Sequence, residues 1–171
     1  GGDGTDQLNG GEGNDYLLGD AGDDAIDGGL GNDFAIGGDG RDSLDGGDGD
    51  DSMIGFADPD LLRGGTGNDM LFGNKGRDTL DGGEGDDSIA AGQKDDIVTG
   101  GVGNDYLFGN KDNDTIDGGD GDDVIYGGNQ NDQLIGGAGN DTLSGDLGDD
   151  ILIGQAGADV FQLRPSSGLD V

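Results

Sequence analysis

The chain repeats one pattern of apolar and polar positions every nine residues. When it is divided into blocks of nine counted from Gly1, the eighth place is apolar and the sixth is aspartate in each of the first eighteen blocks. Block 100–108, for example, reads GGVGNDYLF, and no insertion breaks the frame up to residue 162. A fixed short period is typical of a solenoid, whose units bury their apolar side chains only by stacking on their neighbours.

Each block predicts a turn of six residues followed by a strand of three. Glycines at places one, two and four are expected to let the backbone adopt positive φ and to leave the turn carbonyls uncovered. In a short strand the middle side chain points opposite to its neighbours, so place eight is predicted to face inward and places seven and nine outward. Two blocks, or 18 residues, would then form one flattened coil with strands in two parallel sheets and a turn at each edge.

Composition narrows the possible classes of protein. The chain has 44 glycines, 29% apolar residues and no cysteine, histidine or tryptophan, so disulfides are excluded and ordinary core packing looks weak. Low hydrophobicity with high net charge is otherwise the mark of disorder, but disordered acidic tails do not keep a strict frame. We therefore expect an ordered repeat protein.

Charge excludes several partners and activities. With 39 acidic and 7 basic residues the net charge is −32, which predicts a cationic partner, no nucleic acid and no anionic membrane. No apolar run is long enough for a membrane span, so no membrane insertion is expected. The chain opens directly on the repeat, without a signal-peptide pattern, and we expect it to be part of something longer. No histidine, cysteine, conventional serine triad or substrate cleft is visible, so we predict that it is not an enzyme.

The sixth-place aspartates predict a metal site. Coils stacked roughly 4.8 Å apart would carry a column of carboxylates at each edge. Neighbouring charges would repel by roughly 3 kcal/mol per pair at an effective dielectric constant of about 20. A hard cation that takes about six to eight oxygen ligands suits carboxylates and glycine-rich carbonyls, whereas zinc favours histidine or cysteine and magnesium a stiffer octahedron. Calcium is therefore the predicted ion.

The blocks GGEGNDYLL (10–18), GGTGNDMLF (64–72) and GGAGNDTLS (136–144) resemble the repeats-in-toxin (RTX), or haemolysin-type calcium-binding, nonapeptide repeat. The resemblance implies an all-β fold, a right-handed parallel β-roll of about nine coils, with Ca²⁺ held between adjacent turns by carbonyl oxygens and aspartates. It also implies a secreted bacterial protein, extracellular or at the cell surface, exported by type I secretion. The predicted metal-site aspartates are Asp6, Asp15, Asp24, Asp33, Asp42, Asp51, Asp69, Asp78, Asp87, Asp96, Asp105, Asp114, Asp123, Asp132, Asp141, Asp150 and Asp159. The predicted metal-site glycines are Gly11, Gly13, Gly29, Gly31, Gly47, Gly49, Gly65, Gly67, Gly83, Gly85, Gly101, Gly103, Gly119, Gly121, Gly137 and Gly139.

The two edges are expected to differ, because even blocks stack on even blocks and odd on odd. Even blocks two to sixteen all read GGxGxD, whereas most odd blocks lose a glycine and the odd blocks hold all seven basic residues. We predict an unbroken calcium column on the even edge and an interrupted one on the odd edge, where Lys75, Lys94 or Lys111 partly neutralise the carboxylates. Eight gaps per edge allow at most 16 sites. The alternative, that the departures are tolerated and every site is filled, stays open.

Three further features carry predictions. Block 55–63 (GFADPDLLR) predicts a distorted turn and a weakened site at Asp60, either as a functional kink or as neutral drift. The last nine residues, 163–171, abandon the motif after the roll at 1–162, and with Pro165 they are expected to form a cap or a truncated tail. The strands of the even blocks show an apolar outer face, whose outward residues are Tyr16, Leu18, Phe34, Ile36, Ile54, Met70, Phe72, Tyr106, Phe108, Val124 and Tyr126. It predicts docking of a flanking domain, another roll or a helix, unless these residues merely stabilise the sheet.

Together these patterns predict a calcium-binding module that folds when Ca²⁺ binds after export and forms a stiff scaffold beside an effector domain. The alternative is a cell-surface or adhesive structural protein whose repeats are themselves the functional part.

Overall fold

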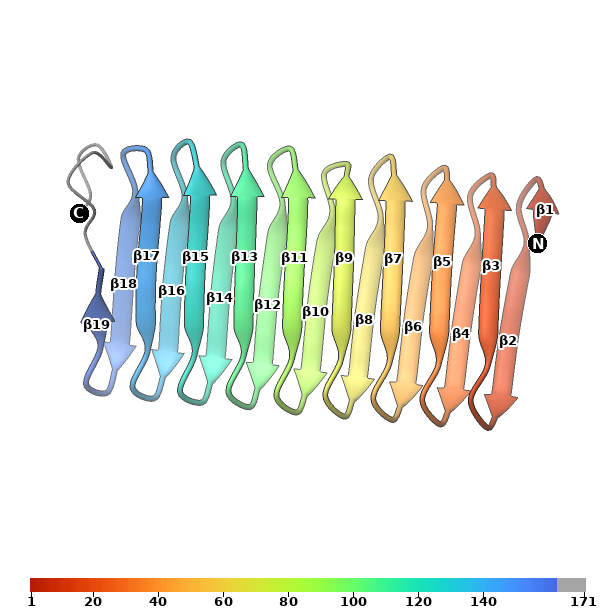
Figure 1. The fold of residues 1–171 in the computed structure, drawn as a ribbon, viewed down its shortest axis with the longest axis horizontal. Coiled ribbons are helices and arrows are strands. Elements are labelled where there is room, and N and C mark those ends of the chain that lie inside the picture. Colours follow the sequence, from red (N-terminus) through yellow and green to blue (C-terminus); the bar gives the residue numbers. More distant parts are fainter. Residues whose placement is uncertain (163–171) are drawn as a thin grey trace.

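The computed structural model describes residues 1–162, which form two parallel β-sheets and no helix (Figure 1). The first sheet holds ten strands in the order β1 (Gly2–Asp3), β3 (Tyr16–Ala21), β5 (Phe34–Asp39), β7 (Ser52–Ala57), β9 (Met70–Lys75), β11 (Ser88–Gln93), β13 (Tyr106–Lys111), β15 (Val124–Asn129), β17 (Thr142–Leu147) and β19 (Val160–Phe161). The second holds nine, β2 (Gln7–Glu12), β4 (Ala25–Leu30), β6 (Ser43–Asp48), β8 (Leu61–Thr66), β10 (Thr79–Glu84), β12 (Ile97–Val102), β14 (Thr115–Asp120), β16 (Gln133–Ala138) and β18 (Ile151–Ala156). Within these residues no helix could cross a membrane.

Consecutive strands lie in opposite sheets, and Figure 1 shows the odd-numbered strands pointing one way and the even-numbered strands the other. Each strand pairs in parallel with the strands one coil before and one coil after it, so that Leu80 lies between Leu62 and Val98. These pairings confirm a two-sheet β-solenoid of about nine turns with about 18 residues per turn.

The strands are longer than the sequence analysis predicted. Except for the two-residue strands β1 and β19 at the ends, they have six residues, from place seven of one block to place three of the next, so the turn keeps only places four to six. Pairing resumes beyond place one, where Gly83 pairs with Gly101 and Glu84 with Val102. The glycines at place two have φ between 98° and 123°, which reorients the peptide plane while the chain stays extended. The expected six-residue turn is therefore wrong.

The core is a stack of apolar side chains at place eight, joined in β11 by the buried Ala91. At place eight the side chains from Ile26 to Leu143 are at most 3% exposed, and Leu8, Leu17 and Leu152 pack against this stack at its ends. The inward orientation of place eight is thereby confirmed, except that Phe161 in the last strand is 46% exposed. The expected cap at 163–171 lies outside the described residues.

Candidate metal centre

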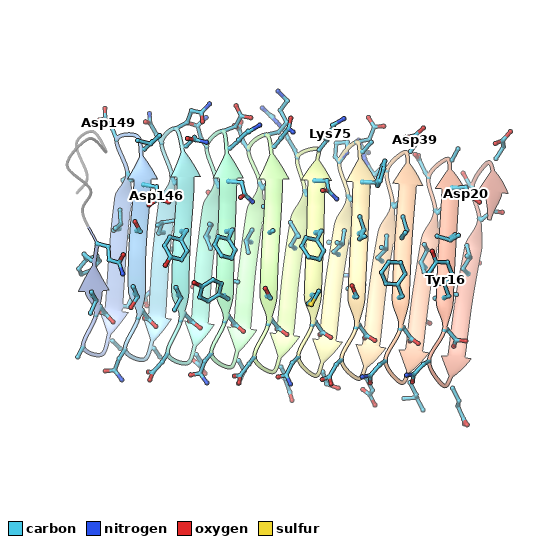
Figure 2. The ribbon with its side chains drawn as sticks, in the orientation of Figure 1. Tyr16, Asp20, Asp39, Lys75, Asp146 and Asp149 are labelled. Atoms are coloured by element: carbon cyan, nitrogen blue, oxygen red, sulfur yellow. The ribbon has the colours of Figure 1, made fainter. Side chains whose placement is uncertain are left out.

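The sixth-place aspartates end the turns and form two columns, one at each edge of the roll (Figure 2). The even edge carries Asp15, Asp33, Asp51, Asp69, Asp87, Asp105, Asp123, Asp141 and Asp159. The odd edge carries Asp6, Asp24, Asp42, Asp60, Asp78, Asp96, Asp114, Asp132 and Asp150. From Asp24 to Asp150 these carboxylates are at most 4% exposed. All the predicted aspartates therefore lie where the sequence analysis expected them.

One oxygen of each carboxylate connects two coils. Oδ1 accepts a hydrogen bond from the backbone N–H of the aspartate 18 residues earlier, as when Asp87 N–H donates to Asp105 at 2.8 Å. The same bond recurs across every gap on both edges, from Asp6 to Asp24 through to Asp141 to Asp159, at 2.7–3.2 Å. This ladder confirms that even blocks stack on even blocks and odd on odd.

From Asp6 to Asp141 the second oxygen of these carboxylates, Oδ2, is buried without a hydrogen-bond partner. It lies tightly against the glycine at place one, since a Cβ on Gly82 would stand 2.2 Å from Oδ2 of Asp87 and 2.5 Å from the Gly100 carbonyl oxygen. Place one is therefore closely packed and is glycine in seventeen of the eighteen blocks, with Ala91 as the exception. The expected positive φ is wrong at this place, because none of its glycines has one.

Carbonyl oxygens of the glycines at places two and four point along the stack toward the next coil. A Cβ on Gly65 would lie 2.1 Å from the carbonyl oxygen of Gly47, and one on Gly67 would lie 2.2 Å from that of Gly49. All the predicted metal-site glycines have positive φ, as expected for places two and four. The turns thus place uncovered carbonyl oxygens at the same edges as the carboxylate columns.

Burial raises the pKa of these aspartates, because charged carboxylates lose hydration inside the roll and neighbouring carboxylates in most cases add repulsion. The pKa rises to about 6 for Asp51, Asp78 and Asp105, to about 7 for Asp87, Asp96, Asp123 and Asp132, and to about 8 for Asp60 and Asp114. The N–H bond to each Oδ1 acts in the opposite direction but is the smaller effect. Such carboxylates favour a bound proton or a bound cation.

The donor set fits calcium. In residues 1–162 no three acidic side chains gather to hold a metal by themselves, so other ligands have to come from the backbone. Buried carboxylate oxygens without hydrogen-bond donors, next to aligned carbonyls, match the all-oxygen coordination of Ca²⁺. The ion would neutralise the columns and satisfy the Oδ2 atoms.

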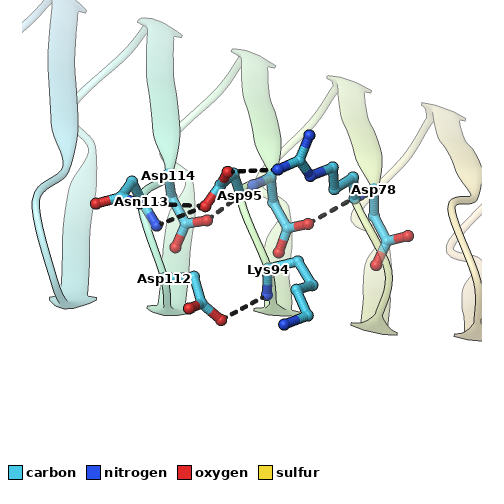
Figure 3. Close-up of polar contacts among 8 residues, drawn as sticks. Asp78, Lys94, Asp95, Asp112, Asn113 and Asp114 are labelled. Carbon is cyan, nitrogen blue, oxygen red and sulfur yellow. Dashed lines mark hydrogen bonds and ion pairs between the residues drawn. The ribbon is translucent and has the colours of Figure 1, made fainter.

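Except at Gly76, which lacks the positive φ of place four, the odd edge keeps the backbone conformation of the motif but loses hydrogen bonds. Its substituted places two and four, such as Asn74 and Lys94, still have positive φ. On the even edge every place-four N–H, from Gly13 to Gly139, donates to a place-three carbonyl of the next coil. Among the described odd-edge residues, the place-four N–H groups of Gly4, Gly22 and Gly76 make this bond. The place-four N–H of Lys94 donates instead to Asp112 Oδ2 at 3.0 Å (Figure 3).

The basic residues of the odd edge contact the columns less than expected. Arg77 forms an ion pair with Asp95 at 3.0 Å, but Asp95 stands at place five, outside the carboxylate column (Figure 3). Lys75, Lys94 and Lys111 form no ion pair within residues 1–162. Charge neutralisation by these lysines therefore stays a prediction without a contact to support it.

Block 55–63 is less disturbed than expected. Phe56 and Asp58 adopt positive φ in the two glycine places, and Phe56 pairs in register with Gly38 and Asn74. The carboxylate of Asp60 still accepts the N–H of Asp42 at 2.8 Å. The departure appears as lost place-four bonds and leaves the strands intact. Weakened calcium binding at Asp60 stays a prediction.

The outer face of the first sheet carries the aromatic side chains. Tyr16 and Phe34 stack at 5.1 Å between ring centroids, and Phe108 stacks on Tyr126 at 5.4 Å with Tyr106 edge-on. This face is formed by β3 to β17, the strands of the even blocks. The outward orientation is confirmed, and the rings contact their neighbours across coils.

This fold and these columns define a repetitive β-roll suited to calcium. The family model of the RTX calcium-binding nonapeptide repeat matches residues 1–35, 31–57, 54–89, 81–125, 99–134 and 126–161. The chain belongs to this family of calcium-binding repeats. A search of curated protein sequences found no match to it.

Proposed function

We propose that this chain is a module of a secreted protein that folds when calcium binds after export and then forms a stiff scaffold beside an effector domain. The observation that carries the proposal is the pair of buried carboxylate columns whose Oδ2 atoms lack partners. At neutral pH their repulsion opposes the metal-free roll, and Ca²⁺ would remove it. Folding and binding then become one reaction.

The calcium concentration inside and outside the cell would decide where the chain folds. Extracellular modules bind Ca²⁺ with dissociation constants of about 10⁻⁴–10⁻³ M, far above the free concentration in cytosol. The chain would stay unfolded for export and fold outside. We assign it no catalytic role, since its buried carboxylates all belong to the columns.

A calcium titration of the metal-stripped protein tests the proposal. Far-UV circular dichroism should change from coil to β-structure as Ca²⁺ rises, with calorimetry counting at most about 16 ions, and Mg²⁺ should not substitute. Full β-structure in the metal-free protein at pH 7.5 would refute calcium-driven folding. A folded chain that binds no Ca²⁺ would refute the site as well.

We further propose that the even edge fills first, because its GGxGxD turns and place-four bonds are complete. Asp105 and Asp114 form a matched pair on opposite edges of neighbouring blocks, and both are buried. Asp105→Asn should lower the calcium affinity and stoichiometry more than Asp114→Asn. Equal losses would favour the alternative in which every site on both edges is filled.

A second candidate, an adhesive surface protein, is favoured by the uncharged outward residues at places seven and nine of the first sheet. From Tyr16 to Tyr126, places seven and nine on this sheet carry no charged residue, although the whole chain has a charge of −32. Calcium-loaded protein on beads should then adhere to cells or to itself, and Tyr106→Ser with Phe108→Ser should abolish adhesion. Unchanged adhesion would remove this candidate.

A further inference from the structure

We propose that the fifth-place side chains of the even edge are positioning residues that latch each calcium turn to the next without metal. This inference rests on the proposed calcium function and concerns residues outside the carboxylate columns. The latch residues are Asn14, Asn32, Asp50, Asn68, Asp86, Asn104, Asp122 and Asn140.

Each latch residue makes the same bond to the following coil. Its Oδ1 accepts the backbone N–H of the fifth-place residue 18 positions later, as when Asn104 N–H donates to Asp86 at 2.7 Å. The bond spans every gap of the even edge, from Asn14 with Asn32 to Asn140 with Ala158, at 2.7–3.2 Å. The even edge thus has an unbroken second ladder beside the carboxylate column.

The two ladders run in opposite directions. A sixth-place aspartate reaches back, so Asp87 Oδ1 accepts the N–H of Asp69 in the preceding coil. A fifth-place side chain reaches forward, so Asp86 Oδ1 accepts the N–H of Asn104 in the following coil. Each turn is therefore held by both neighbours, and the forward bond uses no oxygen of the metal column. In the folded roll this bond holds neighbouring turns, and with them the adjacent carboxylates, at a fixed spacing.

The order of residues along the latch limits repulsion. Asp50, Asp86 and Asp122 each stand between two asparagines, so their charges are two coils apart. The amides of Asn104 and Asn140 also donate Nδ2–H to Oδ1 of the preceding aspartate, at 3.1 Å and 3.0 Å. Asparagine and aspartate are interchangeable here because both place an acceptor oxygen at the same distance from the backbone.

The odd edge shows where the latch fails. Its fifth places include Arg41, Pro59 and Arg77, and in the described structure no fifth-place N–H···Oδ1 bond spans the three gaps between Arg41 and Asp95. Proline has no N–H and arginine no acceptor, so neither can make the bond. Beyond it the bonds return, since Asn113 N–H donates to Asp95 at 3.2 Å. Loss of the latch thus follows the fifth-place residue itself, since Asn131 N–H still donates to Asn113 although that block has lost two glycines.

Asp86 offers a test with two variants that both lack its charge and differ in the acceptor oxygen. Asp86→Ala removes both charge and acceptor, whereas Asp86→Asn removes the charge alone and copies the neighbouring latch residues. We expect Asp86→Ala to lower the apparent calcium affinity by about tenfold and to speed hydrogen exchange of the Asn104 amide in the calcium-loaded protein. Asp86→Asn should restore both to the wild-type values. Asp122→Ala and Asp122→Asn provide a second pair if the first alanine variant fails to fold.

Arg77→Ala is the matched control at a fifth place without a latch, and it should leave the affinity within about twofold. If the wild-type protein binds calcium but Asp86→Ala and Asp86→Asn bind it with equal affinity, the latch is overturned and the proposed function stays intact. If the asparagine variants fail to rescue exchange and affinity, the latch is likewise overturned. Absence of calcium binding by the wild-type protein would instead refute the proposed function.

Discussion

Acid should partly replace calcium, and this prediction follows directly from the buried columns. The perturbation is a fall in pH from 8 to 5 in the metal-stripped protein. Nine carboxyls with pKa values raised to between about 6 and 8 carry the effect, namely Asp51, Asp60, Asp78, Asp87, Asp96, Asp105, Asp114, Asp123 and Asp132. In the unfolded chain the pKa of the same groups is about 3.9.

The sign of the effect follows from proton binding. Between about pH 4 and the raised pKa, each group is protonated in the roll and ionised in the unfolded chain, so folding takes up protons. Each such group favours folding by about 1.4 kcal/mol for every unit of falling pH. That stability is lost as pH rises through the pKa values of the folded state. Several groups acting together produce a steep dependence on pH between 8 and 5.

Far-UV circular dichroism of metal-stripped protein at pH 8, 7, 6 and 5 measures the effect. Light scattering should accompany it, because the isoelectric point of the sequence lies at about 4.1 and precipitation has to be excluded. The β-signal should grow as pH falls. In calcium-saturated protein, protons should compete with the ion and growth should be absent. A metal-free signal that is unchanged or smaller at pH 5 would refute the account of the columns.

Three substitutions, two of them paired with a control variant, test the packing of the roll. Leu107→Ala, at a fully buried place eight, should lower the free energy of unfolding of the calcium-loaded protein by about 2–5 kcal/mol. Leu147→Ala, at a site 48% exposed, should lower it by far less, and equal melting temperatures of the two variants would contradict the core assignment. Phe56→Gly should stabilise the roll by about 1 kcal/mol, because Phe56 is held at φ 95°, and a lower melting temperature would argue against this strain. Gly82→Ala should weaken calcium binding, measured by calorimetry, because the added Cβ would contact Oδ2 of Asp87. Ala91→Gly is the control and should not weaken binding. Unchanged affinity in Gly82→Ala would count against the close packing at place one.

The period of the sequence was sufficient to predict the coil, the inward place eight and the two aspartate columns. Each of these follows from one residue type at one place, such as Leu107 or Asp105. Glycine at places one and two was harder to interpret, because the same residue answers two different demands. Gly101 has a φ of 118°, whereas Gly100 lacks positive φ and leaves room for the Asp105 carboxylate. Sequence shows that a place is restricted but not which contact restricts it.

The fifth-place ladder escaped the sequence analysis for a related reason. Place five varies between asparagine and aspartate on the even edge, as at Asn68 and Asp86, and so looks unconstrained when identity alone is counted. The shared property is one acceptor oxygen, which both residues supply. The signal was present as the restriction of eight successive even blocks to these two residue types.

The turn around Pro59 is where the odd edge should open first. Within the described residues, neither Gly40 nor Asp58 makes the place-four bond, and the fifth-place latch is missing on both sides of Pro59. Two hydrogen bonds of Asp60 therefore connect this turn to its neighbours. The Asp60 carboxylate accepts the N–H of Asp42, and the Asp60 N–H donates to the carboxylate of Asp78. Hydrogen exchange of the Asp60 amide in the calcium-loaded protein should be faster than that of Asp69 on the intact even edge. Equal protection of the two amides would show that the strands alone hold the turn.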